Sequence, residues 1–434
     1  MLELWVYIES LKKYVGEEVE IRGWLRRFRS SGKIQFLYMR DGTGFVQGIV
    51  EKSSVSPDVF ELTKEIKMEA SVKVKGVVKE ERRAPGGVEI HVKDVKIVHN
   101  PDEDFPINKP DHGIDFLMEN RHLWLRTKRQ FHLSHIRNEI IKATREFYNS
   151  RNFVLVDTPI FTGSIGESAG NCFELDYFDY GKAYLAQTGQ LYLEAACIGL
   201  GKVYNLGPTF RAEKSKTRRH LIEFWMNEAE VAYYRHEDNI RLQEDLVEFV
   251  VKKTLERAEV DLKEIGRDTS LLEKVEKPFP KISYTDAVKL LQQKGLDIKW
   301  GGDFGSDEET IIAKEFDKPV VIEKYPRMAK AFYMPPDPDN PDVVLCNDMI
   351  APEGYGEIIG ASERIWEEDL LLERIKEFGL DPASYDWYMD LRKFGSVPHS
   401  GFGMGIERVV SWICGLEHVR EAIPFARTLY RIHP

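Results

Sequence analysis

Five short segments between residues 19 and 98 alternate apolar and polar side chains, as strands with one buried face do. Turn signals such as Asp41-Gly-Thr-Gly and Pro85-Gly-Gly separate these segments. Residues 61–68, between the third and fourth segments, predict one short helix. Five strands and a helix in so short a stretch predict a small closed β-barrel. The predicted strands are 19–26, 33–40, 45–50, 70–78 and 88–95.

The remainder of the chain predicts a second and larger domain. A stretch rich in proline and acids follows the barrel and predicts a hinge, and a long helical pattern starts near residue 130. Strands then alternate with helices to the end, although residues 266–345 read as an irregular insertion. We therefore expect a barrel over residues 1–100, a linker or hinge over 101–129, and the larger domain over 130–434.

Composition excludes several classes of protein. The chain has no apolar run of about 18 residues, so no transmembrane helix is expected. Its first residues carry acids and lack a basic start, so we expect no signal peptide and a cytosolic location. The four cysteines are isolated, which argues against a zinc ribbon. The net charge of −11 hides a slightly basic front, net +3 over residues 1–100, so it does not exclude a nucleic-acid partner.

The segment from Val203 to Glu230 predicts a hairpin with a basic loop between its strands. Arg211 and Glu213 share a face of the first strand, and Phe224 and Glu228 share a face of the second. Arginine binds phosphate with two hydrogen bonds, and an aromatic ring stacks on a nucleobase, so the pattern favours a nucleoside polyphosphate. The alternative is an ordinary hairpin whose charges point to water. The basic loop residues are Lys214, Lys216, Arg218, Arg219 and His220.

Two further segments carry possible chemistry. Three alternating glycines from Gly401 run into an apolar helix with Arg408 in its first turn, a pattern that favours an anion; the alternative is a tight strand-to-helix turn. No hydrophobic strand precedes the glycines, which argues against a dinucleotide-binding site. In the segment 347–364, Asp348 and Glu357 are candidate Mg²⁺ ligands beside phosphates; the alternative is a surface loop with solvated acids.

Together these segments resemble, in the right order, the signature motifs of class II aminoacyl-tRNA synthetases. The first motif, a helix and then a strand ending in proline, resembles residues 137–159; the second resembles 210–224, and the third 401–408. The barrel, with Gly23-Trp24 and Arg40-Asp41, resembles the anticodon-binding domain of the aspartyl/asparaginyl/lysyl subgroup. The resemblance implies an α+β fold: an N-terminal OB-fold barrel, then a catalytic domain on a mainly antiparallel sheet flanked by helices.

Within this subgroup the chain resembles the archaeal-type asparaginyl members. Leu193 stands where aspartyl relatives carry a lysine that faces the substrate carboxylate. An asparagine amide would donate to Glu228 and accept from Arg364. Aspartate would be rejected, because it would leave buried groups of the pocket unpaired and because Glu228 would repel its carboxylate. Glu363 departs from the glutamine frequent in relatives. Alternatives stay open: a strict or non-discriminating aspartyl-tRNA synthetase or, less favoured, an asparagine synthetase-like enzyme or an inactive tRNA-binding regulator.

The resemblance implies ATP-dependent ligation of L-asparagine to tRNA through an asparaginyl-adenylate, with Mg²⁺, in a homodimer. Arg211 and Arg408 are the expected catalytic residues. The expected ATP-binding residues are Arg211, Glu213, Arg219, His220, Phe224, Glu357, Gly405 and Arg408. The expected amino-acid-binding residues are Glu167, Gln190, Arg211, Glu228 and Arg364, and the expected Mg²⁺ ligands are Glu357 and Asp348. Phe36, Gln47, Arg27 and Arg29 would contact the anticodon, although Phe36 also fits the barrel core.

Overall fold

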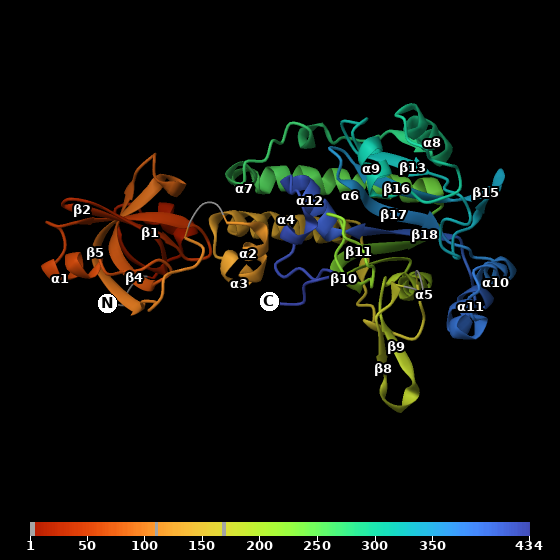
Figure 1. The fold of residues 1–434 in the computed structure, drawn as a ribbon, viewed down its shortest axis with the longest axis horizontal. Helices are drawn as coiled ribbons and strands as arrows, with labels where there is room; N and C mark the ends of the chain where they lie inside the picture. The colour runs from red at the N-terminus through yellow and green to blue at the C-terminus, as the bar shows by residue number, and fades with distance from the viewer. Residues whose placement is uncertain (1–4, 109–111, 167–170) are drawn as a thin grey trace. The chain divides into compact units, whose positions relative to one another are not determined.

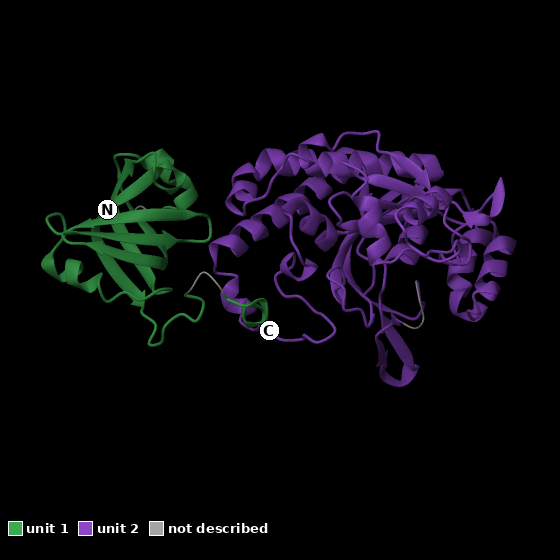
Figure 2. Ribbon diagram, turned by 45° about the horizontal axis from the view of Figure 1, so that its top comes forward, with its two compact units in different colours: residues 1–118 green, residues 119–434 purple. Residues whose placement is uncertain are grey.

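The computed structural model describes residues 5–108, 112–166 and 171–434. It divides into two compact units, residues 1–118 and 119–434, coloured separately in Figure 2. Each unit has its own buried core. Within the described residues no helix is both long and apolar enough to cross a membrane.

The first unit contains the predicted closed barrel, with strand order β1-β2-β3-β5-β4 (Figure 1). Along β4 and β2 every second side chain is buried, which is why the alternating pattern of the sequence located these strands. Gly76 lies where β4 passes close to β5, and a Cβ there would overlap the His91 carbonyl. The strands are β1 Glu18–Ser31, β2 Ile34–Arg40, β3 Phe45–Glu51, β4 Ser71–Glu80 and β5 Val88–His99, with short 3₁₀ turns at Ile8–Tyr14 and Pro85–Gly87.

The helix of the barrel begins earlier than predicted. The expected short helix between the third and fourth strands is present, but its predicted bounds of 61–68 were wrong, because helix α1 spans Pro57–Leu62. Ser56 caps it by accepting a hydrogen bond from the backbone N–H of Val59, and Pro57 supplies a pre-set first turn. The capping residue Ser56 and the following Pro57 therefore set where the helix begins, and the apolar spacing of residues 61–68 did not.

The second unit is built on an eight-stranded sheet of order β12-β13-β16-β17-β18-β11-β10-β6. All neighbours pair antiparallel except the outermost pairs, β12 with β13 and β10 with β6. This confirms the mainly antiparallel sheet. Its strands are β6 Val154–Leu155, β10 Lys202–Phe210, β11 Glu223–Ala232, β12 Lys281–Ser283, β13 Val320–Glu323, β16 Cys346–Ala351, β17 Gly356–Glu363 and β18 His399–Gly405.

Long helices cover one face of this sheet (Figure 1). Helix α4, Lys128–Ser150, and helix α6, His236–Arg257, share a buried core with α12, Ile406–Cys414, and with apolar residues of the strands. Asn239 of α6 donates to the carbonyl of Gly401, and Gln243 exchanges hydrogen bonds with Asn347 of β16. The remaining helices are α2 Ile114–Glu119, α3 Arg121–Trp124, α5 Gln190–Leu200, α7 Glu259–Glu264, α8 Tyr284–Gln293, α9 Ser306–Ala313, α10 Glu368–Glu377 and α11 Asp386–Lys393.

Residues 266–345, expected to be irregular, contain regular elements. Strands β12 and β13 extend the main sheet beside β16, and helices α8 and α9 pack on them around a small apolar core. Ser283 caps α8 by accepting from the backbone N–H of Asp286. Strands β14, Pro336–Asp337, and β15, Asn340–Val344, form a separate hairpin. The elements are short and apolar in brief runs only, so periodicity did not reveal them.

The end of the predicted linker is helical and anchored. Arg121 of α3 is almost completely buried and donates to the carbonyls of Ile423 and Pro424, at 2.9 and 2.8 Å. Burial lowers the pKa of Arg121 to about 10. The hydrogen bonds replace the water that the guanidinium loses, and they join α3 to the C-terminal segment of the same unit.

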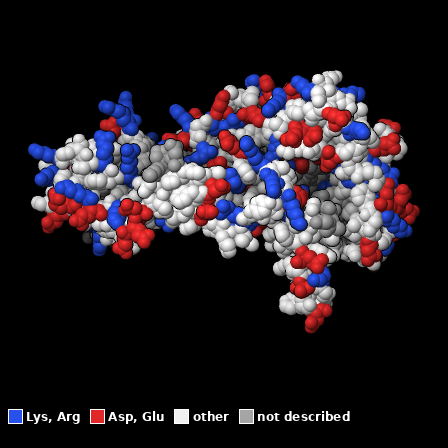
Figure 3. All heavy atoms as spheres, viewed as in Figure 1, with Lys and Arg blue, Asp and Glu red and all other residues white. Residues whose placement is uncertain are grey.

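A small three-stranded sheet projects from the second unit as an arm (Figure 1). Its strands are β7 Phe161–Thr162, β8 Glu174–Asp176 and β9 Lys182–Leu185. Acidic side chains gather near its tip, as Figure 3 shows. Exposed aromatic rings, Phe178 and Tyr180, lie in the turn between β8 and β9.

The close packing of β18 gives a test of the sheet. A Cβ at Gly401 would overlap the carboxylate of Glu230 and the carbonyl of Ala229. We expect Gly401→Ala to lower the free energy of unfolding by roughly 1–3 kcal/mol through overpacking. Gly199→Ala, on an exposed turn of α5 with nothing within 4 Å, is the matched control and should stabilise by about 0.5–1 kcal/mol. Calorimetric melting checks both, and equal melting temperatures would contradict the packing argument.

Candidate active site

Strand β11 brings the chemistry-bearing segments together. It pairs with β10 on one side and β18 on the other, and β18 pairs with β17. Glu228 of β11, Gly403 of β18 and Gly360 of β17 are register neighbours, so their Cα atoms form one row across three strands. Residues distant in the sequence therefore face the same side of the sheet.

A cavity of about 480 Å³ opens above this part of the sheet. Three residues of the insertion 266–345, Phe304, Gly305 and Lys330, also line the cavity. The insertion, for which the sequence suggested no role, therefore closes one side of it. Glu167 lies outside the described residues, and Glu228 lies buried beneath the cavity without lining it. The predicted site residues in the lining are Gln190, Arg211, Glu213, Arg219, His220, Phe224, Asp348, Glu357, Arg364, Gly405 and Arg408.

Two arginines and the aromatic ring of Phe224 line the same cavity. The guanidinium carbon of Arg211 lies 5.5 Å from the ring centroid of Phe224. Arg408, in the first turn of α12, donates to the carbonyl and carboxylate of Glu357, at 2.9 and 3.0 Å. Near them, the His220 ring lies 3.4 Å from Glu213. Burial, followed by the charge of Arg408, lowers the pKa of His220, so this ring is neutral at physiological pH.

Arg219 points differently from its expected role. Its guanidinium donates to the Glu309 carboxylate and the Ser306 carbonyl, both at 3.1 Å, and it also contacts Thr310 and the Gly354 carbonyl. It therefore pins helix α9 to the hairpin loop, and its role toward phosphates stays a prediction. Sequence reasoning missed Glu309, whose carboxylate also accepts from the backbone N–H of Glu357.

Glu357 and Asp348 converge on one point. A Cβ on Gly360 would lie 3.0 Å from Oε1 of Glu357 and 3.7 Å from Oδ1 of Asp348, so the glycine leaves space between two carboxylates. Mg²⁺ prefers carboxylate oxygens together with water and phosphate, and this donor set fits it. Lys330 was not predicted; its ammonium lies 2.8 Å from Asp348 and 3.2 Å from Asp303. Burial, followed by the nearby charge of Glu357 and against that of Lys330, raises the pKa of Asp348 to about 7.

The candidate amide pocket differs from the expected pairing. The carboxylate of Glu228 accepts from the Thr188 hydroxyl and from the backbone N–H of Gly189 at 2.9 Å. Arg364 lines the cavity, but its guanidinium is bound to Glu230, with Nε at 3.0 Å from Oε1. Glu230 was missed, although it stands two residues beyond Glu228 on the same face of β11.

Leu193, which stands where aspartyl relatives carry a lysine, does not line the cavity. Leu193 is fully buried and packs with Cys197 and Val203, away from the cavity. Gln190 and Leu193 lie three residues apart on α5, and only Gln190 lines the cavity. Because Leu193 does not face the cavity, any charge discrimination at this end must come from the two buried acids of β11, Glu228 and Glu230.

Gln190 is held by a buried polar network. Its amide donates to Glu194 at 3.0 Å, and Glu194 accepts from Arg392 at 2.7 Å and lies 2.9 Å from the His399 ring. Burial alone would raise the pKa of Glu194, but Arg392 and His399 outweigh burial and hold it well below its ordinary value. The network fixes Gln190 on the cavity wall.

The predicted anticodon residues gather on one outer face of the barrel. Arg29 lies opposite Phe36 in the β1–β2 register, and Arg27 lies opposite Tyr38, which lies opposite Gln47 of β3. Phe36 is only half-buried, whereas its neighbours Gln35 and Leu37 are buried, so the alternative of a core residue fails. The Arg29 guanidinium lies 5.1 Å from the Phe36 ring centroid. Tyr38 is an aromatic residue on this face that the sequence analysis did not select.

Family models match almost the whole chain. Residues 113–429 match the model described as tRNA synthetases class II (D, K and N). Residues 19–98 match the model of an OB-fold nucleic acid binding domain.

Individual relatives are similar over their full length. The asparagine–tRNA ligase of Symbiobacterium thermophilum is 55% identical over 99% of this chain and 100% of the relative. The crystal structure of asparaginyl-tRNA synthetase from Pyrococcus horikoshii complexed with asparaginyl-adenylate has a TM-score of 0.95 and 44% identity, covering 100% of both chains. An aspartyl-tRNA synthetase from Entamoeba histolytica has a TM-score of 0.83 and 27% identity, covering 99% of this chain and 92% of the other.

The carboxylates at Gly360 predict a pH-dependent metal affinity. Asp348 binds a cation only when ionised, and its pKa is raised to about 7. The apparent affinity for Mn²⁺, used as a spectroscopic substitute for Mg²⁺, should therefore rise about tenfold between pH 6 and pH 8. Titrations followed by electron paramagnetic resonance test this. Asp348→Asn should remove the pH dependence; if the variant keeps it, another group is titrating.

Proposed function

Because this chain belongs to the class II tRNA synthetases (D, K and N), we propose that it activates L-asparagine with ATP and transfers it to tRNA. One observation carries the proposal: Arg211, Arg408, Phe224 and Glu357 line a single cavity whose inner end lies above the acids of β11. The relatives named asparagine–tRNA ligase and the adenylate-bound structural relative support the same substrate.

In the first step the carboxylate of asparagine attacks the α-phosphorus of ATP. A bond forms between a carboxylate oxygen and phosphorus, the bond to the bridging oxygen of the β-phosphate breaks, and pyrophosphate leaves with its electron pair. Arg211 neutralises the charge that gathers on the α-phosphate, and Arg408 stacks on the adenine opposite Phe224. Glu213 accepts from the adenine amino group. Positioning and electrostatics carry this step, and no side chain acts as a nucleophile.

Glu357 and Asp348 would hold Mg²⁺ in the space that Gly360 leaves. When bound, the ion neutralises phosphate oxygens and orients the leaving pyrophosphate. His220 would contact the outer phosphates, and Arg219 would add its positive charge there while its guanidinium stays bonded to Glu309 of α9. In the second step a hydroxyl of the terminal ribose of tRNA attacks the adenylate carbonyl. The ester bond forms, the acyl–phosphate bond breaks, the hydroxyl proton passes to a phosphate oxygen of the leaving group or to water, and AMP leaves.

Acids beneath the pocket favour asparagine over aspartate. The amide NH₂ of the substrate reaches past the cavity lining to Glu228, which keeps its hydrogen bonds to Thr188 and Gly189. Glu167 and Gln190 bind the ammonium group of the substrate. Arg364 donates to the amide oxygen, and its bond to Glu230 prevents it from offering a full unpaired charge to a second carboxylate. An aspartate side chain would meet Glu228 at close range, and hydrogen-bonded sites of this kind discriminate by roughly 10⁴-fold.

The barrel binds the anticodon, with Phe36 stacking on an unpaired base, Gln47 bonding its edge, and Arg27 and Arg29 on the backbone.

Two copies of the chain pair through the segment that joins α4 to β6. Strand β6 is the edge of the main sheet, and Val154 and Leu155 are 43% and 44% exposed in the single chain. Because it charges tRNA for protein synthesis, we place the enzyme in the cytosol.

Aminoacylation with each amino acid tests the substrate. We expect the purified protein to attach asparagine to tRNA bearing the asparagine anticodon, and aspartate at least about 10³-fold more slowly in kcat/KM. Charging with radioactive asparagine and aspartate in parallel measures this. Equal rates would make the enzyme non-discriminating, and charging by aspartate alone would reject the proposed substrate.

Two alanine variants test the division of labour between the units. Arg211→Ala should slow ATP–pyrophosphate exchange by at least about 10²-fold, because a charge at the α-phosphate is lost, while tRNA binding persists. Phe36→Ala should raise the KM for tRNA and leave the exchange unchanged. Val98→Ala, an exposed residue at the end of β5, is the matched control in the barrel. If Phe36→Ala impairs both reactions equally, the barrel does not act through tRNA alone.

A further inference from the structure

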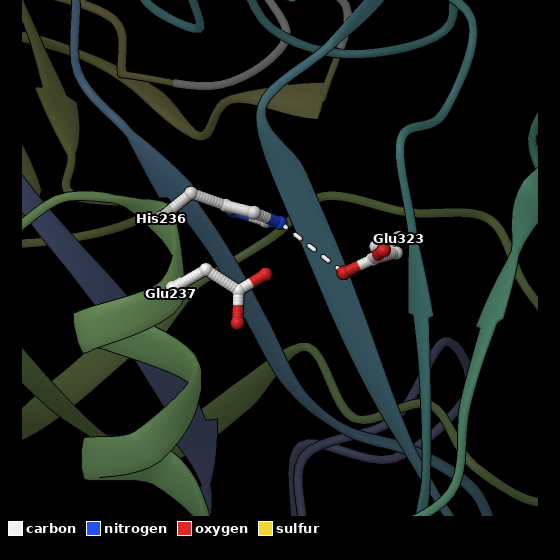
Figure 4. A group of neighbouring side chains, drawn as sticks. All are labelled: His236, Glu237 and Glu323. Atoms are coloured by element: carbon white, nitrogen blue, oxygen red, sulfur yellow. Dashed lines mark ion pairs between the residues drawn. The ribbon is translucent and has the colours of Figure 1, made fainter.

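We propose that His236, Glu237 and Glu323 form a binding site for a first-row divalent cation such as Zn²⁺, separate from the catalytic cavity. His236 and Glu237 begin helix α6, and Glu323 ends strand β13. Figure 4 shows the three side chains converging from the helix and the strand on one point.

The spacing of His236 and Glu323 fits two ligands of a tetrahedral ion, with Glu237 close enough to be a third. One ligand atom from each residue lies within 4.8 Å of the other two, and Nε2 of His236 lies 3.5 Å from Oε2 of Glu323. Zinc bonds to nitrogen and oxygen of about 2.0–2.2 Å place tetrahedral ligand atoms about 3.4 Å apart. The histidine–glutamate distance matches the edge of such a tetrahedron and is long for a hydrogen bond.

Unsatisfied polar atoms point into the site. His236 is 6% exposed, and apart from the ion pair of Nε2 with Glu323 at 3.5 Å neither of its ring nitrogens has a hydrogen-bond partner among the described residues. Oε2 of Glu323 is also buried without a hydrogen-bond partner there. Buried polar groups are nearly always satisfied, and here Nδ1 has no partner and the imidazole and carboxylate meet only across a 3.5 Å ion pair, so a partner between them is missing. A cation bound by both would supply it.

Neighbouring charges leave the site available to a cation. Arg235 pairs with Glu363 at 3.0 Å, and Lys324 pairs with Asp337 at 2.8 Å. Glu363 also accepts from the backbone N–H of His236. Lys281 holds one oxygen of Glu237 at 2.7 Å, but this pair is open to solvent and contributes little, so the cation can displace it.

The site lies behind the strand that carries Asp348. Glu323 is the register partner of Asn347, whose side chain bonds to Gln243 of α6 on the helical face of the sheet. Asp348, one residue on, faces the cavity on the other side. A bound cation would therefore tie the first turn of α6 to the edge of the sheet and take no part in adenylate chemistry.

Cobalt uptake tests the proposal. Co²⁺, a spectroscopic substitute for Zn²⁺, is titrated into the full-length protein with excess Mg²⁺ present to fill the carboxylate site at Gly360. We expect one equivalent to give the visible absorption of four-coordinate Co²⁺, with a water as fourth ligand, and Zn²⁺ to bleach it and to raise the melting temperature.

Substitutions identify the ligands. His236→Gln and Glu323→Gln should lose the absorption and the zinc-dependent shift in melting temperature. Glu237→Gln, at an exposed position that does not threaten folding, should weaken cobalt binding. His132→Gln removes a buried histidine of α4 that is bonded to Asp261, and as the matched control it should keep both signals. No cobalt band in the native protein, or a band unchanged in His236→Gln and Glu237→Gln, would overturn the proposal.

Discussion

The antiparallel pairing of β11 between β10 and β18 is the constraint on which the candidate site depends. Met226 faces Gly405, and Glu228 faces Gly403, so the returning strand of the hairpin and the glycine-rich strand share one register. A shift of one residue would turn Glu228 and Phe224 to the helical face. Glycines at 401 and 403 make this pairing possible, since a Cβ at Gly403 would lie 2.7 Å from the Met226 sulfur. The alternating glycines therefore leave room for buried side chains of β11.

One buried carboxylate joins the three motif segments. Glu407, beside Arg408, accepts from the backbone N–H of Trp225 at 2.9 Å and pairs with Arg137 of α4 at 2.7 Å. Trp225 follows Phe224 directly, so this hydrogen bond fixes the two groups that would enclose the adenine. Burial raises the pKa of Glu407, and the Arg137 charge opposes that rise. The helix next to the proposed dimer edge is thereby connected to the ATP end of the cavity.

The sequence predicted those parts of the fold whose signals are local. The barrel strands and the pairing of β10 with β11 follow from alternating side chains, but the placement of Arg211 and Glu213 on a strand face was wrong, because β10 ends at Phe210. Arg211, Glu357 and Arg408 line one cavity, as the motif order predicted. Contacts between distant segments were not predictable. Packing between elements decides these contacts: it bonds Arg364 to Glu230, places Lys330 beside Asp348, and turns Leu193 into the apolar core. The strands of the insertion were missed because each is too short to show a period.

The proposed reaction depends on charges held at fixed positions around a shared cavity, with cations at the phosphate end and acids at the amide end. A crystal structure with a non-hydrolysable asparaginyl-adenylate analogue tests it most directly. The account predicts the adenine between Phe224 and Arg408, the phosphate mimic beside Arg211, and the amide nitrogen within hydrogen-bond distance of Glu228. An analogue bound elsewhere, or bound with its side-chain amide turned away from Glu228 and Arg364, would contradict it.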